Sequence, residues 1–144
     1  MQKKTTRLRK VVAIAELEEQ NECIEMKKVQ RALDQAVDRL HELTSYRRKY
    51  QSEPALKGSV GAGRWQDYQR FLARLNQAVE SQSEFVNNHE QILESHRRRW
   101  QEKHKRVDLL EKIMQRYIRA EAQRDERSMQ KALDELQPAS RSFE

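Results

Sequence analysis

Three histidines are the first residues whose type and spacing could do chemistry. His89 and His96 lie seven residues apart on one predicted helix, and His104 follows eight residues later. Imidazole nitrogens bind zinc, but metal ligands carried on one helix normally stand three or four residues apart, as in H-E-x-x-H. We therefore interpret the three histidines as polar positions within a helical packing seam, and we expect neither a metal nor any other cofactor.

The sequence contains no motif that supports catalysis. A glycine-rich phosphate loop, H-E-x-x-H, C-x-x-C and a nucleophile elbow are all missing. Cys23 is the only cysteine, which predicts a reducing compartment. The apolar run 11–15 is too short for a signal peptide or a membrane span. We predict a soluble, cytoplasmic protein that is not an enzyme and takes no small-molecule substrate.

Basic residues gather around Trp100 and at the N-terminus. The first group comprises Arg97, Arg98, Arg99, Lys103, Lys105 and Arg106, and the second contains Arg7, Arg9 and Lys10. The chain carries a formal net charge of +6. Such groups could dock into an acidic protein channel or onto nucleic acid. Alternatively, they form a solvated helix face whose arginines pair with the acidic run 16–25, and both interpretations stay open.

A strict seven-residue repeat over 65–117 predicts the helix that positions these residues. Apolar residues occupy every a position, whereas the d positions are apolar only at the two ends of the repeat. This pattern is typical of a coiled-coil helix, which cannot bury its seam alone. The a positions are Trp65, Leu72, Val79, Val86, Leu93, Trp100, Val107 and Met114.

A second, less regular stripe precedes it and predicts a helix over about 5–50, with Thr5 or Thr6 as its cap. Pro54 and the glycines Gly58, Gly61 and Gly63 interrupt helical geometry and allow the chain to reverse over a loop at 51–63. We therefore predict an all-α fold in one domain, 1–144. Two long helices form an antiparallel coiled-coil hairpin, with the second helix over about 64–136 and a loose tail at 137–144. A dimer or trimer of hairpins is the alternative.

The loop centre predicts the register of the hairpin, in which residue n faces about residue 115 − n. This register places the acidic run 16–25 opposite Arg97–Arg99, and the seam residues Glu19 and Glu22 near His89 and His96. It also places the N-terminal basic residues beside the group around Trp100. One end of the hairpin is therefore expected to be strongly positive.

The loop end of the hairpin is expected to expose an apolar strip. The g positions of the second helix, which lie beside the seam, are occupied by Phe71, Ala78, Phe85 and Ile92. A pair of tyrosines, Tyr46 and Tyr50, approaches from the first helix. An exposed aromatic and aliphatic strip predicts a protein-binding face. Ordinary packing at the flank of the seam is the alternative.

The run R-W-Q-D-Y-Q-R-F-L at 64–72, following a glycine-containing loop, resembles the R-W-x-x-Y-Q-x-F signature of flagellar FliJ proteins. The Tyr46 and Tyr50 pair, the basic cluster after Trp100 and the chain length fit the same family. The resemblance implies a fold similar to the stalk subunit of rotary ATPases. It also implies a cytoplasmic protein at the inner membrane of the flagellar base.

Membership of this family implies binding to the FliI ATPase ring and to the export-gate protein FlhA, with the regulator FliH and export chaperones as further partners. At the positions that match the gate-binding residues of the family, this sequence has Leu43, Tyr46, Tyr50, Phe71, Leu75 and Ala78, and the resemblance implies that these residues contact the gate protein. The basic end, with Arg7, Arg9, Lys10, Arg97, Arg98, Arg99, Lys103 and Arg106, would enter the ring. The alternatives are an injectisome stalk, a nucleic-acid-binding coiled coil and a homomeric structural coil.

Overall fold

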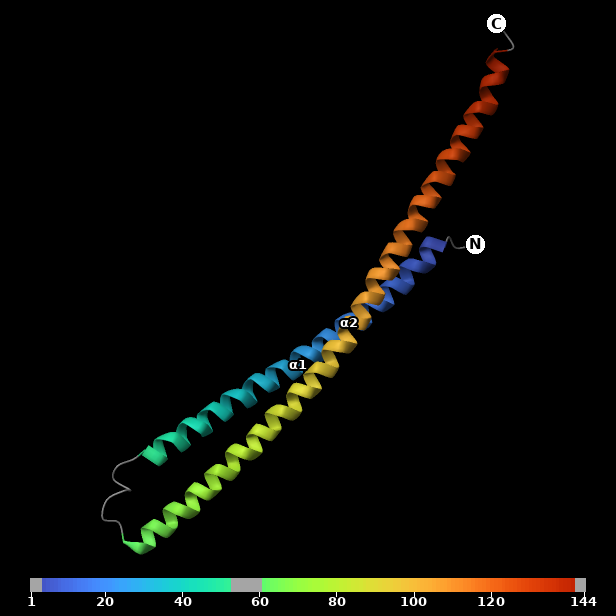
Figure 1. The fold of residues 1–144 in the computed structure, drawn as a ribbon. Coiled ribbons are helices and arrows are strands. Elements are labelled where there is room, and N and C mark those ends of the chain that lie inside the picture. The colour runs from blue at the N-terminus through green and yellow to red at the C-terminus, as the bar shows by residue number, and fades with distance from the viewer. Residues whose placement is uncertain (1–3, 53–60, 142–144) are drawn as a thin grey trace. The chain divides into compact units, whose positions relative to one another are not determined.

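The computed structural model describes residues 4–52 and 61–141, and both ranges are helical almost throughout. Helix α1 spans Lys4–Ser52 and helix α2 spans Ala62–Arg141 (Figure 1). The two helices pack against each other in antiparallel directions, which confirms the predicted all-α hairpin. Residues 53–60, which include Pro54 and Gly58 of the predicted loop, lie outside the described residues.

The predicted seams supply the buried residues of both helices. On α2 these belong to the heptad repeat, and on α1 they belong to the less regular stripe. Burial of one apolar stripe on each helix is what stabilises a two-helix coil, because neither helix can remove its stripe from water alone. The buried apolar residues are Val12, Ala15, Leu33, Ala36, Leu75, Val79, Val86, Leu93 and Val107.

The chain divides into two compact units, each built from part of α1 and part of α2. One unit is Met1–Asn21 with Gln101–Glu144, and the other is Glu22–Trp100. Leu33, Ala36, Val86 and Leu93 form the core cluster of the unit Glu22–Trp100. Partly buried α1 residues on both sides of Leu33 and Ala36, among them Met26 and Leu40, pack against this cluster.

The register in the unit Glu22–Trp100 lies close to the prediction. The contacts Tyr50–Tyr68, Ala36–Gln82 and Glu22–His96 join residues whose numbers add to 118, against the predicted 115. In the other unit, Lys4–Tyr117, Glu19–His104 and Thr5–Glu121 add to 121, 123 and 126, so the prediction is wrong there by about two to three turns. Within the unit Glu22–Trp100 the sum stays at 118 from Tyr50 to Glu22, and the long side chains of Arg47 and Arg97 reach further along the partner helix, to Asn76 and Gln30.

The start of α1 differs from the sequence prediction. Thr5 or Thr6 was expected to cap the helix, but α1 already includes Lys4, and Thr5 is a buried seam residue. Its Oγ1 donates a hydrogen bond of 2.9 Å to a carboxylate oxygen of Glu121. The hydroxyl is used across the helix pair because the seam position would otherwise leave a buried polar group without a partner.

The ends of α2 also differ from the prediction. Gly61 and Gly63 were expected to supply backbone freedom for the reversal, but neither has a positive φ. Instead, the Gly61 carbonyl accepts a hydrogen bond of 3.2 Å from the Trp65 N–H in the first turn of the helix. At the other end, α2 continues past the predicted end near 136 to Arg141, because a proline in the last turns removes only one backbone hydrogen bond.

Candidate protein-binding surfaces

Aromatic side chains from both helices form one cluster in the unit Glu22–Trp100. Tyr50 is its centre, with ring centroids 4.5 Å from Phe71, 5.1 Å from Tyr68 and 6.3 Å from Tyr46. Tyr46 also meets Phe71 edge-on at 6.2 Å, and Trp65 stacks on Tyr68 at 5.5 Å. The structure therefore brings together Tyr46, Tyr50 and Phe71, which were predicted from the sequence to contact a partner protein.

The outer part of this cluster is available to a partner. Tyr46 is 52% exposed and Trp65 is 49% exposed, whereas Tyr50 and Phe71 are half-buried. Leu43 is half-buried and Ala78 is exposed, but Leu75 is only 7% exposed. The assignment of Leu75 to the contact surface therefore needs correction, because a seam residue packs beneath the surface and cannot be touched directly.

Sequence reasoning placed Trp65 and Tyr68 in the seam and left them out of the contact surface. Their large exposed or half-buried rings and their stacking contacts make them members of the aromatic cluster. Their position in the first turns of α2, directly after the loop, could have predicted this, since seam residues at the start of a helix are less completely covered by the partner helix.

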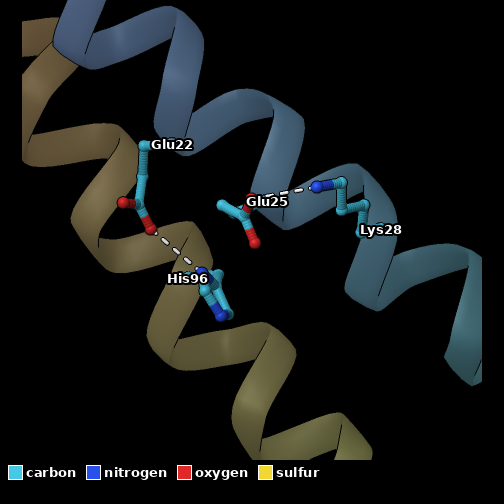
Figure 2. A network of polar contacts seen from close by, with 4 residues as sticks. All are labelled: Glu22, Glu25, Lys28 and His96. Atoms are coloured by element: carbon cyan, nitrogen blue, oxygen red, sulfur yellow. Dashed lines mark hydrogen bonds and ion pairs between the residues drawn. The ribbon is translucent and has the colours of Figure 1, made fainter.

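Polar seam contacts connect the acidic run of α1 to the histidines of α2. In the unit Glu22–Trp100, His96 Nδ1 lies 3.0 Å from Glu22 Oε1, and both side chains are largely buried (Figure 2). Glu25, drawn beside them, pairs with Lys28 on its own helix at 3.2 Å. The predicted meeting of Glu22 with His96 is confirmed, while His89 Nδ1 lies 3.0 Å from the carbonyl oxygen of Phe85 on its own helix.

The other unit holds a denser cluster of titratable groups. His104 Nδ1 lies 2.8 Å from Glu19 Oε1, and its Nε2 lies 3.6 Å from Asp108. The hydrogen bond to Glu19 raises the pKa of His104, and the charge of Asp108 acts in the same direction. A hydrogen bond with Glu16 raises the pKa of Glu111, helped by partial desolvation and by repulsion from neighbouring carboxylates.

Arg97, Arg98 and Arg99 are exposed, and the pairing with the acidic run that one of the two interpretations expected does not form for them. Arg97 donates to Gln30 at 3.4 Å, and Arg98 pairs with Glu94 on its own helix at 3.5 Å. Within residues 4–52 and 61–141, no ion pair joins Arg97–Arg99 to the run 16–25. The run 16–25 is contacted instead by His96 and His104, through Glu22 and Glu19, while Arg97 reaches α1 beyond the run, at Gln30.

The N-terminal basic residues also lie elsewhere than predicted. Lys4 Nζ lies 5.8 Å from the centre of the Tyr117 ring, and Thr5 bonds to Glu121. This segment therefore lies about three turns along α2 from Arg106, within the same unit. Arg7, Arg9 and Lys10 are exposed, as is Arg106, while Lys103 is half-buried. That these basic residues form one positive end stays a prediction.

Comparison with known proteins decides the family. Residues 3–143 match the family model described as Flagellar FliJ protein. The chain belongs to the flagellar FliJ protein family. The flagellar FliJ protein of Escherichia coli (strain K12) is 24% identical over 125 residues, which cover 85% of this chain and 85% of that protein. No solved structure matches the chain.

Membership of the FliJ family confirms the resemblance read from the run 64–72. That run forms the first turns of α2 and supplies Trp65, Tyr68 and Phe71 to the aromatic cluster. The protein is thus a component related to flagellar protein export. Within the described part of this FliJ protein, neither helix has an apolar stretch long enough to cross a bilayer.

The cluster around His104 predicts that the stability of this FliJ protein depends on pH. Because folding raises the pKa of His104, its stabilising contribution is fully present below pH 6.5 and is lost as the pH rises through the folded value. We expect the thermal midpoint to fall as the pH rises from 6.5. His104→Gln should flatten this dependence, as followed by circular dichroism.

The matched control for this pH dependence is His41→Gln, which changes an exposed histidine on α1. It should retain the wild-type pH profile. Folding also raises the pKa of Glu111, so the stabilising contribution of this group is lost as the pH rises above 4.5. Glu111→Gln should therefore flatten the dependence of the thermal midpoint on pH in this lower range. An unchanged slope above pH 6.5 in His104→Gln would count against the role of the Glu19 contact.

Proposed function

We propose that this FliJ protein is a non-catalytic coupling protein of the flagellar type III export apparatus, linking the FliI ATPase ring to the export-gate protein FlhA. The aromatic cluster of Tyr46, Tyr50, Trp65, Tyr68 and Phe71 carries the proposal. It joins both helices near the loop and leaves two large rings about half exposed. Exposed aromatic anchors supported by buried neighbours are typical of the centre of a protein interface.

The gate contact is proposed for the exposed part of this cluster and the residues beside it. Tyr46 and Trp65 offer the exposed rings, Tyr50 and Phe71 hold them in place, and Leu75 supports them from the core. Leu43 and Tyr46 also line a surface groove on α1 with Arg39 and Glu42. A partner segment with an apolar side chain for the rings and polar groups for this groove would fit the surface.

A binding measurement tests the gate contact. Tyr46→Ala and Trp65→Ala should each weaken binding to the purified cytoplasmic domain of the gate protein by about tenfold or more, since aromatic anchors contribute about 1.4 kcal/mol or more each. Isothermal titration calorimetry gives the dissociation constants. Helix content should stay unchanged because both side chains are half exposed.

The control variant is Leu109→Ala, which truncates an apolar residue that is similarly exposed on α2 in the other unit. It should bind the gate domain like the wild type. Wild-type affinity in the double variant Tyr46→Ala, Trp65→Ala would exclude the cluster as the gate contact.

The ring contact is proposed for exposed basic residues. Arg97, Arg98 and Arg99 are consecutive and exposed, so they point in different directions around α2 and can meet acidic groups on several sides. This arrangement suits a helix surrounded by the walls of a channel. Arg7, Arg9, Lys10, Lys103 and Arg106 supply further positive charge in the other unit. FliH and export chaperones remain further proposed partners.

A further inference from the structure

One face of α2 in the unit Glu22–Trp100 continues beyond the proposed gate contact and, apart from Ala78, contributes no residue to the proposed contacts with the gate or the ring. Ala78, Phe85 and Ile92 follow each other at seven-residue spacing, and Phe85 and Ile92 are 48% and 45% exposed. The residues that alternate with them on this face are exposed and uncharged: Ser81 and Asn88 lie between them, and Ser95 follows Ile92. In a chain that is 36% charged, an uncharged face about five turns long favours packing against another surface.

Helix α1 supplies the second row of this face. The ring contact between Tyr46 and Phe71 shows that the two rows lie side by side, and steps of seven residues extend each row. The contacts of Gln82 with Ala36 and of His96 with Glu22 keep the rows in step. The resulting neighbours are Arg39 with Ala78, Ala32 with Phe85, and Glu25 with Ile92. Arg39, Ala32 and Glu25 are all exposed.

This arrangement is complementary to itself. A half-turn about an axis that crosses both helices at the level of Ala32 and Phe85 places Phe85 on Phe85 of a second copy. The same rotation places the small Ala78 on Ile92, and the positive Arg39 on the negative Glu25, each twice. Ala32 meets Ala32, which lets the two α1 helices approach closely.

We infer that this face pairs two copies of the chain in an isologous, antiparallel contact, with Phe85 at its centre and two Glu25–Arg39 ion pairs at its ends. Within one chain, Glu25 and Arg39 stand about four turns apart on α1 and cannot meet. Each copy contributes only two large apolar side chains, so the contact belongs to the small, concentration-dependent class of interfaces. The face shares Ala78 and Arg39 with the proposed gate surface, but the inference does not rest on the proposed function.

Sedimentation velocity on the full chain tests the contact over about 10 to 500 μM, since an interface below the standard size is expected at the weak, micromolar end of affinities or beyond it. The wild type should shift from monomer to dimer, and Phe85→Asp should stay monomeric. Glu25→Arg and Arg39→Glu should each weaken the dimer by about tenfold, because like charges then face each other. The double variant should restore the dimer, since the pairs re-form with reversed sign.

Leu17→Asp is the matched control, because it adds a charge at an exposed apolar position on α1 outside this face. It should dimerise like the wild type, and so should Tyr46→Ala, which separates this contact from gate binding. In a Cys23→Ser background, Phe85→Cys should form a disulfide-linked dimer on oxidation. A chain that stays monomeric throughout, a dimer that survives Phe85→Asp, or a double charge variant without rescue would overturn the inference.

Discussion

Replacing Leu93 with aspartate is expected to unfold the pairing of α1 with α2 in the unit Glu22–Trp100. Leu93 is 4% exposed and belongs to the core cluster with Leu33, Ala36 and Val86. The variant loses the burial of a leucine and places a carboxylate within this apolar cluster, at a cost of about 3 to 5 kcal/mol. A loss of this size is a large part of the stability of a small domain, which is about 5 to 15 kcal/mol.

Thermal melting followed by circular dichroism at 222 nm measures this effect. The control is Ile92→Asp, which introduces the same carboxylate one residue earlier, at a position that is 45% exposed. At low protein concentration this control should melt within a few degrees of the wild type, since exposed substitutions change stability by about 0.5 kcal/mol or less. Equal midpoints for the two variants would contradict the assignment of Leu93 to the seam.

Charge reversal at Arg97, Arg98 and Arg99 is expected to abolish the proposed docking of the protein into the ATPase ring, which we expect to be measurable as stimulation of the ATPase rate. All three side chains are exposed, and the contacts of Arg97 with Gln30 and of Arg98 with Glu94 are surface contacts worth about 0 to 1 kcal/mol each. The fold should therefore persist while attraction to an acidic channel becomes repulsion. We expect stimulation of the ATPase rate to fall by about tenfold or more, because close like charges cost several kcal/mol at interfaces.

The measurement is the steady-state ATPase rate of the purified ring at increasing concentrations of each variant, at low and at high salt. The matched control reverses Arg47, Arg48 and Lys49, another run of three consecutive basic residues, and should stimulate like the wild type. Stimulation by the wild type should weaken with salt, since exposed charges are screened. Full stimulation by the Arg97–Arg99 variant, combined with a loss of DNA binding, would instead favour the nucleic-acid interpretation.

The sequence was sufficient to predict the fold class, because eight apolar a positions in succession specify a long seam that only another helix can cover. It also located the exposed Phe85 and Ile92 and the contact between Glu22 and His96. These predictions depend on periodicity, which is a local property of the chain. Properties that depend on how far each helix advances along the other were predicted less well.

The register is the main example of this limit. An error of two to three turns moved the N-terminal basic residues to the neighbourhood of Tyr117 and Glu121, and it replaced the predicted pairing of arginines with the acidic run by the Glu19–His104 contact. In the aromatic cluster, periodicity could not show that Leu75 is covered while Trp65 is exposed. Both lie at seam positions, and only the fraying of the seam beside the loop distinguishes them.

The C-terminal part of α2 continues past the start of α1, and Met129, Leu133 and Leu136 are all well exposed on it (Figure 1). No residue of α1 lies opposite this stretch, so its backbone hydrogen bonds are held by helix propensity and by contacts along a single helix. An isolated helix of this length is only marginally stable in water. This stretch is therefore the place where hydrogen exchange and proteolysis should begin, well before the paired helices open, and where docking of a companion would be seen first as protection.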